Sequence, residues 1–201
     1  MLRKTAQLFV GFALLAAVIL CAQHAQRAQA QKKPVAPTMT NGQKIALAES
    51  AGPAEIAKKA TIIDMTDLPN SQMKQLRTGT NGWVCYAMIA QPMCLDKEWQ
   101  KWAAAWMSKS ELKIEGTGIA YMLRGDTGAS NTDPYATEPS ATNQWVVSPA
   151  HIMVLYQDPK MLDAYSTDPK NGGPWVMWKG TPYAHVMVPV SLTKAATMSA
   201  K

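Results

Sequence analysis

The sequence predicts an α+β fold: a single domain with an antiparallel sheet of about five to seven strands and a tryptophan-striped helix packed on one face. Short β-branched or alternating segments are joined through the turn signals Asn81-Gly82 and Lys179-Gly180, which favour antiparallel pairing. One strongly periodic segment, residues 96–107, predicts the helix. With 201 residues, of which 47% are hydrophobic and 17% charged, the chain is long and apolar enough for a folded core.

Residues 1–30 have the three parts of a cleavable signal peptide. Two basic residues precede an uninterrupted apolar run, residues 8–20, and the small-x-small triplet 28–30 follows it. The apolar run has 13 residues, whereas a membrane-spanning helix needs about 20. We therefore expect cleavage after Ala30. The mature protein is expected in the periplasm or secreted, with no membrane association after cleavage.

The mature chain carries only a small positive charge. Cleavage removes three basic residues and no acidic one, so the formal net charge falls from +6 to +3. Lys and Arg form no cluster, and we therefore expect no nucleic-acid partner. Thirteen methionines and seven tryptophans are more than a chain of this length usually carries. The sequence leaves the oligomeric state and the ligand open.

Two cysteines remain after the signal peptide is removed, Cys85 and Cys94. An even number of cysteines in an exported protein predicts a disulfide, here one that closes a small loop. The alternative is a redox or metal-binding pair. Eight intervening residues fit neither C-x-x-C chemistry nor the usual zinc spacing, so the structural role is favoured.

The first half of the mature chain begins with a flexible lead-in, residues 31–42, ahead of a single globular domain, residues 43–190. Residues 43–50 and 54–60 predict two short helices, the second with a proline just before it. Residues 61–65 are β-branched and apolar and predict a strand. A second strand is expected at residues 84–89, entered through the Asn81-Gly82 turn.

The clearest helix is predicted over residues 96–107, with Asp96 as its N-cap. Its apolar residues recur at the spacing of one helical face, and its charged residues take the opposite face. A stripe of three tryptophans could bind a sugar or an aromatic ligand. It is more often the face packed against a sheet, which we favour for Trp99, Trp102 and Trp106.

The second half of the domain is richer in strands. A strand is predicted at residues 116–123, and a long polar loop, residues 124–143, is expected to be a solvated surface loop, although such loops often bind ligands. Residues 144–156 form a strand pair or one bent strand interrupted by a proline. A short helix, residues 160–165, precedes a final hairpin at residues 174–190. Residues 191–201 look like a loose tail.

Two strands of this half repeat the pattern Ala-His-x-Met-Val. Alternation along a strand places His185 and Met187 on one face, opposite the apolar face formed by Ala184, Val186, Val188 and Val190. His151 and Met153 repeat the arrangement. We expect the apolar set to be the core side and the His/Met side to be available for chemistry. If the two strands are neighbours, two imidazoles and two thioethers would suit copper, Cu(I) above all.

Other roles of these residues remain open. Each His could bond locally while each Met fills the core, which would leave a structural or interaction module stabilised by the disulfide. One His could instead serve a hydrolase or lyase-like enzyme, oriented by Asp96, Asp126 or Asp133. The G-x-S-x-G, H-E-x-x-H and P-loop motifs are missing from the sequence. We expect a non-enzymatic domain that binds a small ligand or a metal.

The segments LRTGTNGWVC, PMCLD, YML and GGPWVMWKGTPYAHVMVPV together resemble exported bacterial proteins of uncharacterised function. The resemblance covers most of the mature chain, residues 56–190. It implies an envelope location and a single domain, and it implies no activity and no site residues.

Overall fold

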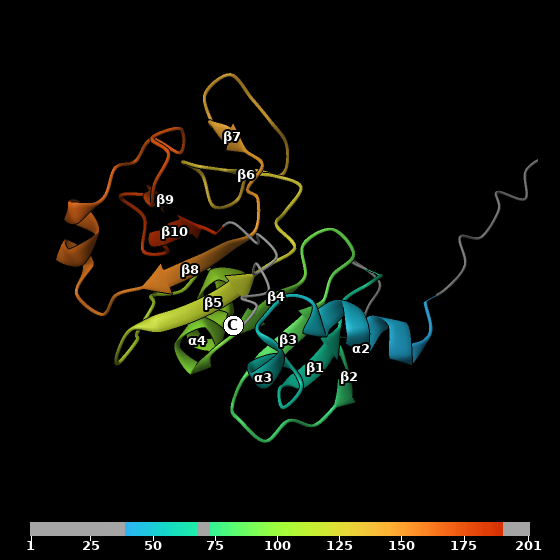
Figure 1. Ribbon diagram of the computed structural model, residues 1–201. Helices are drawn as coiled ribbons and strands as arrows, with labels where there is room; N and C mark the ends of the chain where they lie inside the picture. Colours follow the sequence, from blue (N-terminus) through green and yellow to red (C-terminus); the bar gives the residue numbers. More distant parts are fainter. Residues whose placement is uncertain (1–38, 68–72, 191–201) are drawn as a thin grey trace, which may run out of the picture. The chain divides into compact units, whose positions relative to one another are not determined.

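An eight-stranded sheet runs through the computed structural model, which describes residues 39–67 and 73–190 (Figure 1). The strands are ordered β2 (Lys74–Arg77), β1 (Thr61–Asp64), β3 (Val84–Ala87), β4 (Met93–Leu95), β5 (Gly118–Met122), β8 (His151–Leu155), β10 (His185–Pro189) and β9 (Trp175–Met177). A separate two-stranded sheet pairs β6 (Ala129–Ser130) with β7 (Trp145–Val146). The α+β single domain is confirmed, and the main sheet is larger than predicted.

The prediction of a purely antiparallel sheet is wrong at one pair, because β1 and β3 are parallel. β2 pairs with the outer edge of β1, and the chain then crosses to the other side of β1 to begin β3. Asn81-Gly82 is therefore not a hairpin turn. Its role is local: Asn81 Nδ2 donates a hydrogen bond to Ile56 O (2.9 Å), and Gly82 adopts a positive φ of 76°.

The four helices of the described residues lie where the sequence predicted them, with shifted ends: α2 (Asn41–Glu49), α3 (Ala54–Ala57), α4 (Lys97–Ser108) and the 3₁₀ helix η1 (Pro159–Ala164). α2 begins two residues early because Thr40 and Gln43 form a capping box, in which Thr40 Oγ1 accepts from Gln43 N and Gln43 Oε1 from Thr40 N. The predicted lead-in, residues 31–42, thus extends too far. Asp96 caps α4 as predicted, since its Oδ1 accepts from Trp99 N (2.9 Å).

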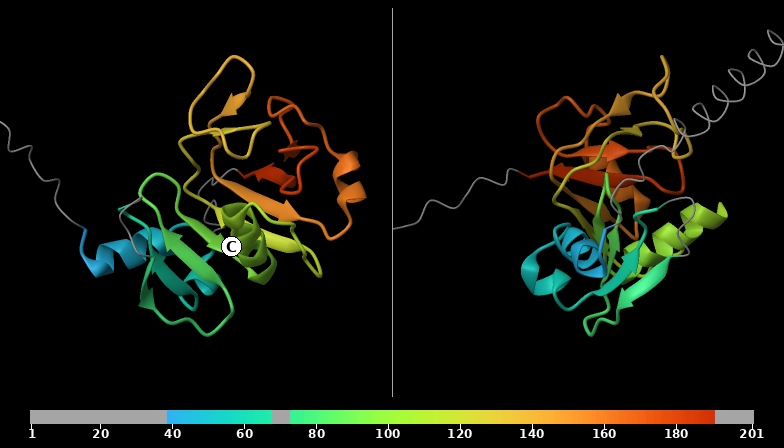
Figure 2. Two further views of the ribbon diagram at one scale, coloured as in Figure 1. Left: turned by 180° about the vertical axis from the view of Figure 1, so that it is seen from behind. Right: turned by 90° about the vertical axis from the view of Figure 1, so that its right-hand side faces the viewer.

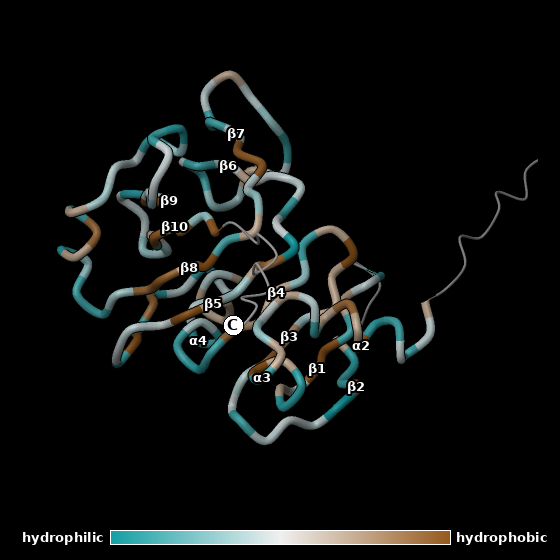
Figure 3. Tube along the Cα trace, viewed as in Figure 1, coloured by the Kyte–Doolittle hydropathy of each residue, from teal (hydrophilic) through white to brown (hydrophobic). Residues whose placement is uncertain are grey.

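The two faces of the sheet are covered by different helices. The right-hand view of Figure 2 shows α2 and α3 on one side of the sheet and α4 on the other. The tryptophans of α4 pack against the largest apolar cluster, which includes Leu95, Met153 and Met187. The opposite face packs against alanines of α2 and α3 at one end and against Leu162 of η1 at the other. Hydrophobic residues concentrate on strands such as β8, as Figure 3 shows.

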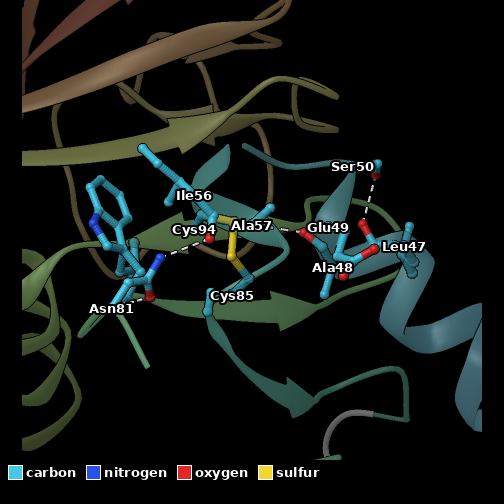
Figure 4. The surroundings of a disulfide bond; sticks show 12 residues. Leu47, Ala48, Glu49, Ser50, Ile56, Ala57, Asn81, Cys85 and Cys94 are labelled. Carbon is cyan, nitrogen blue, oxygen red and sulfur yellow. Dashed lines mark hydrogen bonds between the residues drawn. A yellow bond between two sulfur atoms is a disulfide. The ribbon is translucent and has the colours of Figure 1, made fainter. Parts of the chain in front are cut away.

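The predicted disulfide between Cys85 and Cys94 is present and joins directly opposite residues of β3 and β4. Both cysteines are fully buried, and the bond lies beside Ala48 of α2 and Ala57 of α3 (Figure 4). This position fits a structural crosslink, typical of proteins in oxidising compartments.

Two of the sequence predictions, the signal peptide (residues 1–30) and the C-terminal tail (191–201), lie outside the described residues. Within the described part, no helix is long and apolar enough to cross a bilayer.

Candidate functional site

The two His/Met strands are antiparallel neighbours, β8 and β10. Met153 lies directly opposite Met187, and His151 lies opposite Pro189. All four predicted residues therefore share one face of the sheet. His151 lies opposite Pro189, and His185 is four residues away from Pro189 along β10. At about 3.3 Å per residue, this is about 13 Å of strand. The methionines meet in the middle, and the histidines lie at opposite ends.

The His/Met face is more deeply buried than we expected. His151 is 0% exposed and His185 2%, whereas Ala184 and Val188 on the other face are only partly buried. The tryptophans of α4 cover the His/Met face, while the short η1 covers the apolar face. Val186 on the apolar face is nevertheless 1% exposed, so both faces carry a core, and the sequence-based assignment of a single core side is incomplete. An aliphatic face predicts burial, but methionine is also commonly buried, and a neutral histidine with a hydrogen-bond partner is tolerated in a core.

A cavity of about 450 Å³ lies on this face. Five of the seven tryptophans line it, and so does every methionine between residues 40 and 190 except Met161. Two of these methionines are exposed, Met73 (43%) and Met107 (55%), so the cavity reaches the surface. The methionines that line it are Met65, Met73, Met88, Met93, Met107, Met122, Met153, Met177 and Met187.

The sequence-based prediction missed most of this lining. Met122 lies directly opposite His151 on β5, and Met177 lies opposite His185 on β9. Two signals indicated such a site: the unusual number of methionines and tryptophans, and the stripe of three tryptophans in residues 96–107, which we assigned to the core. Their gathering depends on pairings between distant strands, which no local pattern encodes.

One wall of the cavity comes from the long polar loop, residues 124–143, which we expected to be a solvated surface loop. Ser130 and Asn131 are instead buried. Ser130 O accepts a hydrogen bond from Trp178 Nε1 (2.6 Å), and Asn131 Oδ1 accepts one from Trp175 Nε1 (3.2 Å). These two groups of the loop satisfy buried indole N–H groups and hold Trp178, which lines the cavity, and Trp175 in place, while most other residues of the loop are exposed as expected.

Both histidines are anchored through the same ring nitrogen. His151 Nδ1 lies 2.6 Å from Pro149 O, and His185 Nδ1 lies 2.9 Å from Tyr183 O. A carbonyl only accepts, so each Nδ1 must carry the proton, and each neutral ring keeps its lone pair on Nε2. Nε2 of His151 is buried and has no hydrogen-bond partner among the described residues.

Both imidazoles are held neutral. Burial lowers the pKa of His151, and the hydrogen bond to Pro149 O and the charge of Asp126 oppose this shift only in part. Burial lowers the pKa of His185 further, to about 4. Three indole rings surround His185 edge-on, those of Trp99, Trp102 and Trp178, at centroid distances of 5.2–5.7 Å. At neutral pH the cavity therefore holds two uncharged imidazoles.

The aspartates that could orient a catalytic histidine are engaged elsewhere. Asp96 Oδ1 caps α4, and Asp133 Oδ1 accepts from Tyr135 N (2.9 Å). Asp126 Oδ1 accepts from Gly128 N and Ser148 N, both at 2.9 Å. Each His instead donates Nδ1–H to a backbone carbonyl. The arrangement needed for a carboxylate-oriented histidine base is therefore not formed at either His.

The described residues contain no group of three or more His, Cys, Asp or Glu side chains that could hold a metal ion. The donors on the cavity face are instead imidazoles and thioethers. No protein-family model, curated protein or solved structure matches this chain.

Proposed function

We propose that this domain is a non-enzymatic binding protein that takes a small apolar molecule into the cavity between α4 and the sheet. The observation that carries the proposal is the cavity of about 450 Å³ with its methionine and tryptophan lining. Sites for small organic ligands typically measure about 300–1,000 Å³ and combine an apolar lining with a few polar groups.

The composition of the lining favours flat ligands and tolerates differences in their outline. Trp178, Trp102 and Trp106 are stacked in nearly parallel order, with interplanar angles of 6–8°. Because these rings cover one another's faces, an aromatic guest would pack against their edges, the edge-to-face geometry that aromatic pairs favour. Methionine side chains are flexible and polarizable, so they can adapt to ligands of different outline. We therefore expect fused aromatic compounds to bind, with some tolerance for their shape.

The proposal is tested by filling the cavity from α4. Ala103 lines the cavity, whereas the next residue, Ala104, is exposed on the same helix. We expect Ala103→Trp to weaken the binding of 2-naphthol at least about tenfold by isothermal titration calorimetry, because the indole occupies the space of the guest. Ala104→Trp is the matched control and is expected to bind like wild type.

Two results would contradict the proposal. One is the absence of saturable binding by wild type up to the solubility limit of the compound. The other is an equal loss of affinity in Ala103→Trp and Ala104→Trp, because that result would place the guest outside the cavity.

A second candidate function is Cu(I) binding, and the anchored histidines favour it. Metal-binding histidines commonly donate their other ring N–H to a backbone carbonyl, as His151 does. Imidazole and thioether donors suit this soft cation. About 13 Å of strand separates the two histidines, so one ion would not use all four predicted ligands. His151 with its neighbours Met122 and Met153 is the set that fits.

An anaerobic titration with Cu(I) against a competing chelator tests this second candidate. Tight one-to-one binding that is lost in His151→Asn, and retained in the remote variant Met161→Leu, is the expected result for a copper protein. Equal and weak binding of Cu(I) by all three proteins would exclude the copper function and leave the proposal of an apolar organic ligand.

A further inference from the structure

We propose that the ligand of this cavity is a neutral aromatic molecule with one hydroxyl or N–H group, which donates a hydrogen bond to Nε2 of His151. This inference rests on the proposed function and adds the class of ligand to it. Phenols and N–H heteroaromatic compounds belong to this class.

The unpaired nitrogen of His151 carries the inference. The side chain is 0% exposed, and its Nδ1–H is used by Pro149 O. The lone pair on Nε2 therefore accepts nothing from the described residues, although His151 lines the cavity. Buried polar groups in folded proteins are nearly always paired, and an exception calls for a partner. A ligand hydroxyl or N–H group would supply the missing donor.

The charges around the cavity exclude an anionic ligand. Among the described residues that line the cavity there is no Lys or Arg, while two carboxylates, Asp126 and Asp133, are present. A ligand carboxylate or phosphate would enter an apolar site without a counter-charge, at a large cost in desolvation. The neutral ring of His151 supplies an acceptor and no positive charge. A neutral ligand with a donor group therefore matches Nε2 of His151, and a hydroxyl also offers an acceptor to Trp99 Nε1, a second buried atom of the lining without a partner among the described residues.

The two histidines differ in what surrounds them. Three indole rings enclose His185, which makes it part of the aromatic cluster. His151 lies opposite Met122 and near the loop wall at Asp126. A donor group on the ligand is therefore directed to His151, with its aromatic part against the tryptophans.

Three compounds with the same ring system test the inference by calorimetry at neutral pH. 2-Naphthol has a donor, 2-methoxynaphthalene has only an acceptor, and 2-naphthoate is an anion. We expect wild type to bind 2-naphthol at least about tenfold more tightly than either analogue. In His151→Asn the amide N–H replaces the Nδ1–H bond to Pro149 O but leaves nothing at the position of Nε2. This variant should bind the two neutral compounds with nearly equal affinity.

The outcomes separate this inference from the proposed function. Equal binding of both neutral compounds by wild type would overturn the inference and leave the cavity as a binding site. Tighter binding of 2-naphthoate than of 2-naphthol would overturn the prediction that the ligand is neutral. If the preference for 2-naphthol were lost in His185→Asn and kept in His151→Asn, the acceptor would be His185, and the inference would be overturned. If neither neutral compound binds, the inference and the proposed function fail together.

Discussion

Trp102→Ala is expected to lower the free energy of unfolding by about 3–5 kcal/mol, the usual cost of truncating a large buried aromatic residue. Trp102 lies at the centre of the aromatic cluster. Its ring stacks on Trp106 and Trp178 and meets Tyr183 and His185 edge-on. Its Nε1 donates to Tyr183 O (3.1 Å), so the truncation also removes one of the two hydrogen bonds to this carbonyl, which keeps the one from His185 Nδ1.

Chemical denaturation measured by circular dichroism gives this free energy. Met107→Ala is the matched control, because Met107 is on the same helix and is 55% exposed. We expect the control to stay within about 0.5 kcal/mol of wild type. A loss below about 1 kcal/mol for Trp102→Ala would contradict the packing described here, since a ring buried among five others cannot be removed at so small a cost.

Acidification from pH 7 to pH 4 is expected to remove about 3 kcal/mol of stability through His185 alone. Burial lowers the pKa of this residue from 6.5 to about 4 in the folded state. A shift of one unit corresponds to about 1.36 kcal/mol. Because the folded pKa is the lower one, the unfolded chain takes up a proton in this window and the folded chain does not. Stability is therefore complete above pH 6.5 and falls as the pH is lowered towards 4.

His185→Asn isolates this contribution from that of the carboxylates. The amide N–H of Asn can keep the hydrogen bond to Tyr183 O, and the side chain does not titrate. We expect the variant to be less stable than wild type at pH 7 and to lose less stability on acidification. His151 is the titratable group whose charge acts on His185, and it is unchanged in both proteins. Parallel stability curves for the two proteins would show that His185 is not buried in the neutral form.

The local parts of this fold could be predicted from sequence. The stripe of Trp99, Trp102 and Trp106 predicted α4, because the period of a helix is visible in residues that are close in sequence. The Lys179-Gly180 signal predicted the β9–β10 hairpin for the same reason. The disulfide followed from counting the cysteines that remain after the predicted signal peptide.

The rest depends on contacts between distant residues. β1 and β3 are parallel because the chain forms β2 on one side of β1 and then crosses to the other side. The residues of β1 and β3 give no sign of this crossing. The burial of His151 and His185 depends on which face α4 covers, and a strand of alternating Val and His/Met residues is compatible with either choice. The cavity was missed because its methionines come from separate strands and loops.

Methionine methyl signals test the central claim, that a ligand occupies this cavity, most directly. Nine methionines line the cavity, and Met161 on η1 lies outside it as an internal control. We would titrate protein labelled with ¹³C at the methionine methyl groups with 2-naphthol, assigning each signal from a Met→Leu variant. Ring currents from the guest should shift the signals of Met122, Met153 and Met187 and leave that of Met161 in place. Saturable binding without shifts at these three residues would contradict the account.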